Sequence, residues 1–210
     1  MTQLSVEREI ELTGQIGTNQ MWQAYGLKEI ELTIPPTVYP PREDSSLLDR
    51  TIAELGPGHG KHLLEIGCGS GALSIAAAIR GWKVSACDVN PLAVAATRGN
   101  AAKQGLDWGS EIKEGGPGDL ENWMPEHGAD VIAWNLPYVE ADSEGRLGPM
   151  EDSALIGDNQ SRQLLDAIQS NPFLLKENGI TLLLHSSNQI GYNIARDWRR
   201  SGWATRNISE

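Results

Sequence analysis

The feature that most constrains the fold is an apolar segment followed by three alternating glycines and an alanine-rich segment. Residues 63–66 read Leu-Leu-Glu-Ile, residues 67–71 read Gly-Cys-Gly-Ser-Gly, and residues 72–80 contain four alanines. Glycine lets the backbone turn sharply and approach a ligand that a side chain would block. The pattern therefore predicts a strand, a tight turn and a helix, with a ligand at the turn.

The rest of the chain continues this alternation of strands and helices. Apolar patterning predicts strands at residues 83–87, near 112, at 129–134, at 180–185 and at 203–208. Helices are expected at residues 91–104, 161–169 and 189–200, and at 45–55 with Ser45 as the N-cap. Such alternation predicts an α/β, Rossmann-like fold, a mainly parallel sheet with helices on both faces. Ligands bind beyond the carboxyl ends of strands in such sheets.

Residues 1–34 are predicted to be an N-terminal extension of a domain that comprises residues 35–210. Residues 9–13 and 29–33 both read Glu-Ile-Glu-Leu-Thr, and both alternate apolar and polar side chains. This period is typical of half-buried strands, so a two-stranded ribbon is expected here. A five-residue repeat is too short to indicate a repeat fold, and chance similarity of two edge strands is favoured.

Composition and charge exclude several classes of protein. No apolar run approaches the roughly 18 residues that a membrane helix needs, and the N-terminus lacks a signal-peptide pattern, so a cytoplasmic protein is expected. Cys68 and Cys87 are interpreted as buried thiols, and no metal site is predicted because no Cys or His pair has zinc spacing. The net charge of −11 without a basic stripe disfavours nucleic acid and suits a basic protein partner.

Three acidic residues follow the predicted strands. Glu65 lies at the end of the first strand, where it would repel a pyrophosphate but suit a ligand with an ammonium or sulfonium group. Asp88 ends the second strand, where a carboxylate reaches a ribose diol, although it could instead cap the next helix. Asp119 follows a glycine-rich turn and is placed to accept from an adenine amine, or simply to form the turn.

Residues 135–138, Asn-Leu-Pro-Tyr, stand at the mouth of the fourth strand. The Asn135 side-chain oxygen and the Leu136 carbonyl could accept the two hydrogens of a planar nitrogen and orient its lone pair toward an electrophilic methyl group. Pro137 would stiffen the turn, and Tyr138 would offer a flat face to the planar group. With the preceding motifs, this segment favours N-methylation over a merely polar turn.

The chain resembles class I S-adenosylmethionine (SAM)-dependent methyltransferases with an Asn-Pro-Pro-Tyr motif. Residues 65–71, 88–91 and 135–138 carry this resemblance, and residues 38–45, Val-Tyr-Pro-Pro-Arg-Glu-Asp-Ser, are similar to the HemK/PrmC family, which methylates release-factor glutamine, in its short archaeal and eukaryotic branch. The resemblance implies a cofactor pocket and a site for the glutamine amide. The implied cofactor residues are Ser45, Glu65, Gly67, Gly69, Gly71, Asp88, Asp119, Leu120 and Asn135. The implied amide-binding residues are Asn135, Leu136, Pro137 and Tyr138.

Three departures from that family are visible. Leu136 replaces a proline, which removes a fixed φ and adds a free N–H. The sequence stops at Glu210, whereas the resemblance implies one more antiparallel strand, so we expect either an incomplete sheet or a partner that covers its edge. Residues 1–27 have no recognised counterpart. The resemblance also implies a release factor as substrate and a small zinc-binding activator subunit as partner.

The sequence thus predicts a SAM-dependent N-methyltransferase that modifies a glutamine amide of a protein. The alternatives are methylation of an exocyclic amine of adenine or guanine in RNA or DNA, a catalytically inactive SAM-binding scaffold, and a nicotinamide oxidoreductase. The oxidoreductase reading rests on the glycine turn alone, and Glu65 and residues 135–138 count against it.

Overall fold

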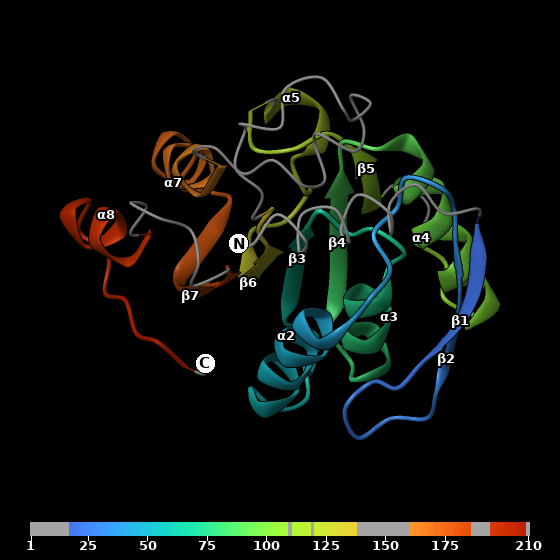
Figure 1. The fold of residues 1–210 in the computed structure, drawn as a ribbon. Coiled ribbons are helices and arrows are strands. Elements are labelled where there is room, and N and C mark those ends of the chain that lie inside the picture. Colours follow the sequence, from blue (N-terminus) through green and yellow to red (C-terminus); the bar gives the residue numbers. More distant parts are fainter. Residues whose placement is uncertain (1–16, 109–110, 119, 138–159, 186–193, 209–210) are drawn as a thin grey trace, which may run out of the picture.

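The computed structural model describes residues 17–108, 111–118, 120–137, 160–185 and 194–208. Five strands form a parallel sheet in the order β5-β4-β3-β6-β7 (Figure 1). They are β3 (His62–Ile66), β4 (Lys83–Asp88), β5 (Ile112–Glu114), β6 (Ala129–Asn135) and β7 (Leu175–Leu184). The helices are α2 (Glu43–Glu54), α3 (Ala72–Ile79), α4 (Pro91–Lys103), α5 (Leu120–Trp123), α7 (Gln160–Ser170) and α8 (Ile194–Arg200).

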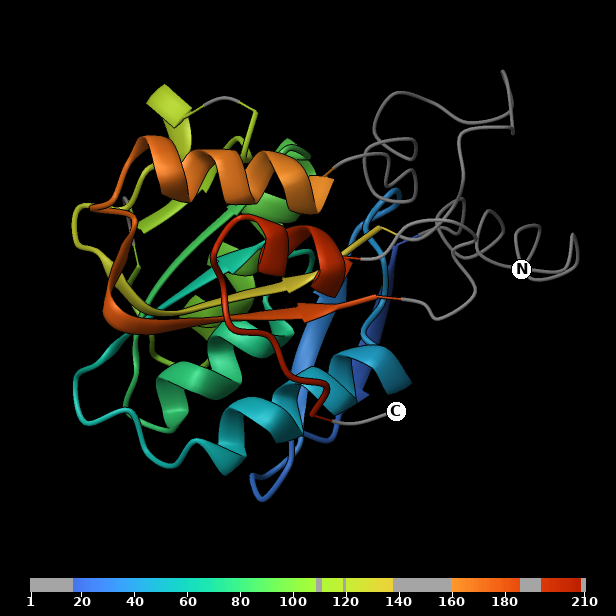
Figure 2. The ribbon, with the colours of Figure 1, turned by 90° about the vertical axis from the view of Figure 1, so that its left-hand side faces the viewer.

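Helices cover both faces of this sheet, which confirms the predicted fold class. Successive strand residues point to opposite faces, so Leu63 and Val131 pack with α2 and α3, whereas Leu64 and Ile132 pack with α7 and α8. Figure 2 shows α7 and α8 above the sheet and α2 and α3 below it. Within the described residues the sheet contains no antiparallel strand, and β5 and β7 form its two edges.

Several predicted elements differ from the structure. Residues 203–208 form no strand, and the strand predicted at 180–185 already begins at Leu175. Ser45 does not cap a helix, because α2 begins at Glu43 with Arg42 as N-cap and no side-chain cap hydrogen bond. The acidic Glu43 and Asp44 of its first turn instead complement the helix dipole. The first residues of the helix predicted at 189–200 lie outside the described residues.

The described part of the N-terminal segment contains a two-stranded antiparallel ribbon. β2 (Ile30–Ile34) pairs antiparallel with β1 (Thr18–Trp22), whereas residues 9–13 lie outside the described residues. The ribbon is anchored to α4 by the buried Asn100, which accepts from the Thr33 N–H at 2.8 Å and donates to the Thr33 carbonyl at 2.9 Å. Its apolar residues share a core with α2 and α3. No helix in the described ranges is long and apolar enough to cross a membrane.

Candidate active site

The carboxyl ends of the three central strands meet at one edge of the sheet. Ile66 of β3 pairs with Cys87 of β4 and with Trp134 of β6, so the residues that follow these three are neighbours. The chain moves from β3 outward to β5 and then returns on the other side as β6, which makes this edge a topological switch point, where ligands bind in α/β sheets. A cavity of about 910 Å³ lies there. The predicted site residues that line it are Ser45, Glu65, Gly67, Gly69, Asp88, Asn135, Leu136 and Pro137.

The glycine turn after β3 forms one wall of this cavity. Gly67 and Gly69 have φ values of 69° and 55°, a left-handed conformation that disfavours side chains. A Cβ atom on Gly67 would lie 3.3 Å from Trp134 Nε1, and one on Gly69 would lie 3.7 Å from the Tyr39 carbonyl oxygen. The missing side chains therefore leave a cradle that a ligand can enter.

Gly71, predicted to bind the cofactor, does not line the cavity. It is the N-cap of α3 with a φ of 83°, and a Cβ atom there would lie 2.9 Å from the Thr97 Cγ2 and 3.1 Å from the Thr97 Cα. The close approach of α3 to α4 explains this glycine without a ligand. The three-glycine pattern could not distinguish the two roles, because both require the same residue.

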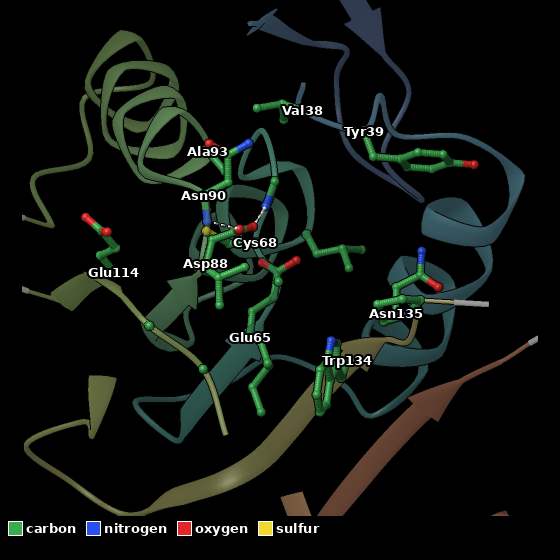
Figure 3. Close-up of a pocket in the computed structure, with 18 of the residues that line it drawn as sticks. Val38, Tyr39, Glu65, Cys68, Asp88, Asn90, Ala93, Glu114, Trp134 and Asn135 are labelled. Carbon is green, nitrogen blue, oxygen red and sulfur yellow. Dashed lines mark hydrogen bonds between the residues drawn. The ribbon is translucent and has the colours of Figure 1, made fainter. Parts of the chain in front are cut away.

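Glu65 lies between Asp88 and Asn135 in the view of Figure 3. Its side chain is buried and accepts a hydrogen bond from the Ser74 hydroxyl of α3. Burial raises the pKa of Glu65 from 4.5 to about 8, although the Ser74 hydrogen bond opposes this, and the Asp88 charge raises it further. A cationic group bound in the cavity would restore the charged carboxylate.

Asp88 lies on the opposite side of this view from Asn135 (Figure 3). Its Oδ2 accepts from the Gly69 N–H at 2.9 Å and its Oδ1 accepts from the Asn90 N–H at 2.9 Å. Burial raises its pKa, and these two bonds oppose the rise. The helix cap is Asn90, whose Oδ1 accepts from the Leu92 N–H at 2.9 Å, so Asp88 does not cap α4. Each oxygen of Asp88 keeps a lone pair for a ligand hydroxyl.

The positively charged side chains of the cavity are held by backbone carbonyls. Arg98 donates to the Ile112 carbonyl, and the Lys113 Nζ donates to the Met124 carbonyl at 2.6 Å. The acidic side chains of Glu65, Asp88 and Glu114 also line the wall, and a bound cation would favour their ionised forms. This balance fits a cationic ligand better than a pyrophosphate.

Asn135 ends β6 and enters the cavity wall beside α2. Its Nδ2 donates to the Asp44 Oδ2 at 2.8 Å. The next residue, Leu136, is buried in the core, and its N–H donates to the Leu184 carbonyl at 2.9 Å. The expectation of a free N–H at this departure from the proline motif is therefore wrong, because β6 and β7 continue their pairing by one residue. Burial of the Leu136 side chain and the hydrogen bond to Leu184 hold this turn in place, a task that a proline would perform by fixing φ.

Some of the predicted residues cannot be placed, and others were missed. Asp119 and Tyr138 lie outside the described residues, and of Leu120 only its backbone position, at the start of α5, is described. Tyr39 and Trp134 line the cavity without having been predicted. The alternation of apolar residues along β6 could have indicated that Trp134 is part of the site. Asp44 lies in the segment 38–45, which the sequence analysis had singled out. No pattern in the sequence, however, pairs Asp44 with Asn135.

Part of the chain is similar to a known protein family. The family of ribosomal protein L11 methyltransferases (PrmA) matches residues 48–136. The L11 methyltransferase of Nitratiruptor sp. is 32% identical over 125 residues, 50% of this chain and 42% of that protein. The Wolinella succinogenes enzyme is 34% identical over 135 residues, 55% of this chain and 48% of that protein. The matched parts thus span less than half of either relative.

Among solved structures, the 16S rRNA N2 G1207 methyltransferase of T. thermophilus, in complex with AdoMet and guanosine, has a TM-score of 0.61. It is 20% identical to this chain, and the match covers 85% of this chain and 44% of that one. At this identity the likeness concerns the fold alone. The fold is thus the Rossmann-like methyltransferase fold that the sequence predicts, and the relatives by sequence are named as methyltransferases.

The finer resemblance to the HemK/PrmC family is not supported, because the matching family is that of the L11 methyltransferases. The match ends at Leu136 and contains the glycine turn, Asp88 and Asn135. These residues line the cavity or lie beside it, and the same segment was the basis of the resemblance to the HemK/PrmC family.

Proposed function

We propose that this protein is a SAM-dependent methyltransferase that transfers a methyl group to a side-chain nitrogen of a protein. The observation that carries the proposal is the convergence of Glu65, Asp88 and Asn135 on one cavity beside a glycine cradle. Its volume of about 910 Å³ lies near the upper end of ligand sites, roughly 300–1,000 Å³. Such a volume leaves room for an acceptor side chain next to a cofactor.

The residues fit SAM at distinct positions. Asp88 would accept from the ribose hydroxyls, and Glu65 would lie near the positively charged groups. When bound, SAM would supply an electrophilic methyl carbon on its sulfonium. The acceptor nitrogen would take this carbon, with the S–C electron pair left on sulfur, and would release one proton to water. Asn135 would hold the acceptor through its side-chain oxygen, which is a task of positioning and needs no histidine base.

A protein acceptor is supported by the relatives, which are named as methyltransferases of a ribosomal protein, and by the net charge of −11, which disfavours a polyanion. Within this proposal, the planar amide of glutamine is the acceptor that the Asn135 and Leu136 acceptor groups suit best. A release factor and a zinc-binding activator subunit remain predictions from the sequence resemblance.

Cofactor binding is tested by calorimetric titration with SAM. We expect the wild type to bind SAM and Asp88→Ala to bind at least about tenfold more weakly, because a lost pair of hydrogen bonds to a carboxylate costs about 1.5–3 kcal/mol. Equal affinity of both proteins would contradict the assigned role of Asp88.

The acceptor is tested with SAM carrying a labelled methyl group and three candidates: ribosomal protein L11, a release factor, and that factor with its glutamine replaced by alanine. Label on the release factor that the Gln→Ala variant loses would identify the amide. Label on L11 alone would indicate an acceptor like that of the relatives. Transfer to RNA with none to protein would overturn the proposal.

A further inference from the structure

We propose that Asp44 is a positioning residue that fixes the side-chain amide of Asn135, so that the amide oxygen and not its nitrogen is offered to the methyl acceptor. The inference rests on the proposed function, in which Asn135 holds the acceptor nitrogen. Asp44 belongs to α2 and Asn135 to β6, and the two are 91 residues apart in the chain. Their contact joins the first helix of the domain to the mouth of the site.

The carboxylate decides which way the amide faces. The Asn135 Nδ2 lies 2.8 Å from the Asp44 Oδ2. A carboxylate only accepts hydrogen bonds, whereas the two ends of an amide are a donor and an acceptor. The reversed amide would place two oxygens at this distance and would lose a charge-assisted hydrogen bond. The Nδ2 is therefore held by Asp44, and the Oδ1 is the polar atom left for a ligand.

Asp44 is itself held in place. Its Oδ1 accepts from the Ser45 N–H at 2.6 Å and from the Ser45 hydroxyl at 3.3 Å, while the Oδ2 is engaged by Asn135. The side chain is half-buried in the first turn of α2. The Oδ1 of Asp44 is thus fixed by α2, and its Oδ2 sets the orientation of the Asn135 amide at the end of β6.

The consequence is a preference for acceptors that carry N–H hydrogens. The Asn135 oxygen attracts an N–H group and directs the nitrogen lone pair away from that bond, whereas an acceptor oxygen without hydrogen would meet like partial charge. An acceptor of the amide or amine type satisfies this requirement. Orientation by Asp44 is needed because a free asparagine amide offers donor and acceptor alternately.

The functional test compares Asp44→Asn with Glu43→Gln. Glu43 precedes Asp44, is 91% exposed and has its carboxylate 3.6 Å from the Arg42 Nε, so its substitution removes the same charge from the same turn and leaves the Asn135 contact intact. With the acceptor protein that takes up label in the assay above, we expect Asp44→Asn to lower the rate at saturating acceptor by about 10- to 100-fold. SAM affinity should change less than about twofold, and Glu43→Gln should match the wild type in both measurements. An Asp44→Asn enzyme with the wild-type rate would overturn the proposal.

A second measurement does not depend on methyl transfer. The side-chain NH₂ resonances of Asn135, assigned by their loss in Asn135→Asp, report the hydrogen bond to Asp44. We expect one proton to be shifted downfield in the wild type and in Glu43→Gln, and to return to the ordinary range in Asp44→Asn. An ordinary wild-type shift would overturn the proposal even if the enzyme is active. A downfield shift in a protein that methylates no candidate would support the orientation and reject the proposed function.

Discussion

At the scale of single residues, the most consequential charge in the cavity is that of Glu65. Burial raises its pKa to about 8, far above its ordinary value of 4.5. In the unfolded chain the carboxyl ionises near 4.5, whereas in the fold it stays protonated. Folding is therefore most favoured below pH 4.5 with respect to this group, and stability falls as the pH rises from 4.5 to about 8.

The first prediction concerns Glu65→Gln. At pH 8, the variant without cofactor should have a free energy of unfolding higher than the wild type by about 4 kcal/mol, because the cost of a buried charge is removed. It should bind SAM more weakly, because the cationic groups lose their partner. Urea unfolding and calorimetry measure the two effects, and a variant that is less stable than the wild type at pH 8 would contradict the burial argument.

The same residue links binding to protons. At pH 7 most of Glu65 is protonated in the cofactor-free protein, and a bound sulfonium or ammonium favours the carboxylate. SAM binding should therefore release a proton near neutral pH. Titrations in buffers with different ionisation enthalpies should give different apparent heats for the wild type and a smaller difference for Glu65→Gln.

Leu136 is the second residue with a definite expectation. Leu136→Pro removes the N–H that bonds the Leu184 carbonyl and part of a buried side chain. The variant should lose about 2 kcal/mol of stability and gain no methyltransferase activity, because the turn is already fixed. Leu136→Met, which keeps the N–H and the volume, should lose less than about 1.5 kcal/mol. Thermal unfolding and the methylation assay together check this, and higher activity of the proline variant would show that the turn needs proline.

At the scale of elements, the contact between α3 and α4 depends on Gly71. A methyl group there would meet both the side chain and the backbone of Thr97 and would be held at a φ of 83°. Gly71→Ala should therefore destabilise the protein by about 2 kcal/mol or more. The matched control is Gly99→Ala within α4, where a Cβ atom meets nothing within 4 Å, and it should stabilise by about 0.5–1 kcal/mol. Denaturant unfolding of both variants decides whether packing explains Gly71.

The elements also show what the sequence could predict. The strand at β3, the helix at α3 and the proline-initiated α4 were predicted nearly at their observed bounds, because apolar period, glycine turns and Pro91 are local signals. The strand predicted at 203–208 was wrong, because its alternation of residues has no neighbouring strand to pair with in the described structure. Local pattern indicates that a segment can be a strand, and only the sheet supplies its partner.

The candidate site, too, was predictable only as far as local sequence signals reach. Glycines and acidic residues at strand ends identify the cavity, since parallel strands bring their carboxyl ends together. Contacts such as Asp44 with Asn135 or Leu136 with Leu184 join segments far apart in the chain and have no local signal. The identity of the acceptor has no such local signal and stays a prediction.

At the scale of the whole molecule, a second buried polar group lies at the amino end of the sheet. His62 at the start of β3 has its Nε2 2.8 Å from the Ser85 hydroxyl and its Nδ1 3.3 Å from the Gly128 carbonyl, and the Ser85 hydroxyl donates to Glu111 at 2.5 Å. Burial lowers the pKa of His62 below 6.5, although the Gly128 carbonyl opposes this. Protonation of this histidine therefore favours the unfolded chain.

This histidine predicts an acid-side loss of stability. The contribution of neutral His62 is fully present above pH 6.5 and is lost as the pH falls through the lowered pKa in the fold. Measured in a Glu65→Gln background, to remove the opposing carboxyl, the free energy of unfolding should fall as the pH is lowered from 7.5 to 5.5. Adding His62→Gln should flatten that slope. An unchanged slope would assign the effect to other groups.

Trp134, which lies under the glycine turn with its Nε1 facing Gly67, gives the molecule an intrinsic optical reporter. Its indole is nearly solvent-free and lines the cavity between Glu65 and Asn135 (Figure 3). We expect a sulfonium bound nearby to change its fluorescence, so that occupancy could be followed by light emission without a label. Subtracting the spectrum of Trp134→Phe isolates this signal from the six other tryptophans among the seven in the chain. Ligand screening on the native protein thereby becomes practicable before any acceptor is known.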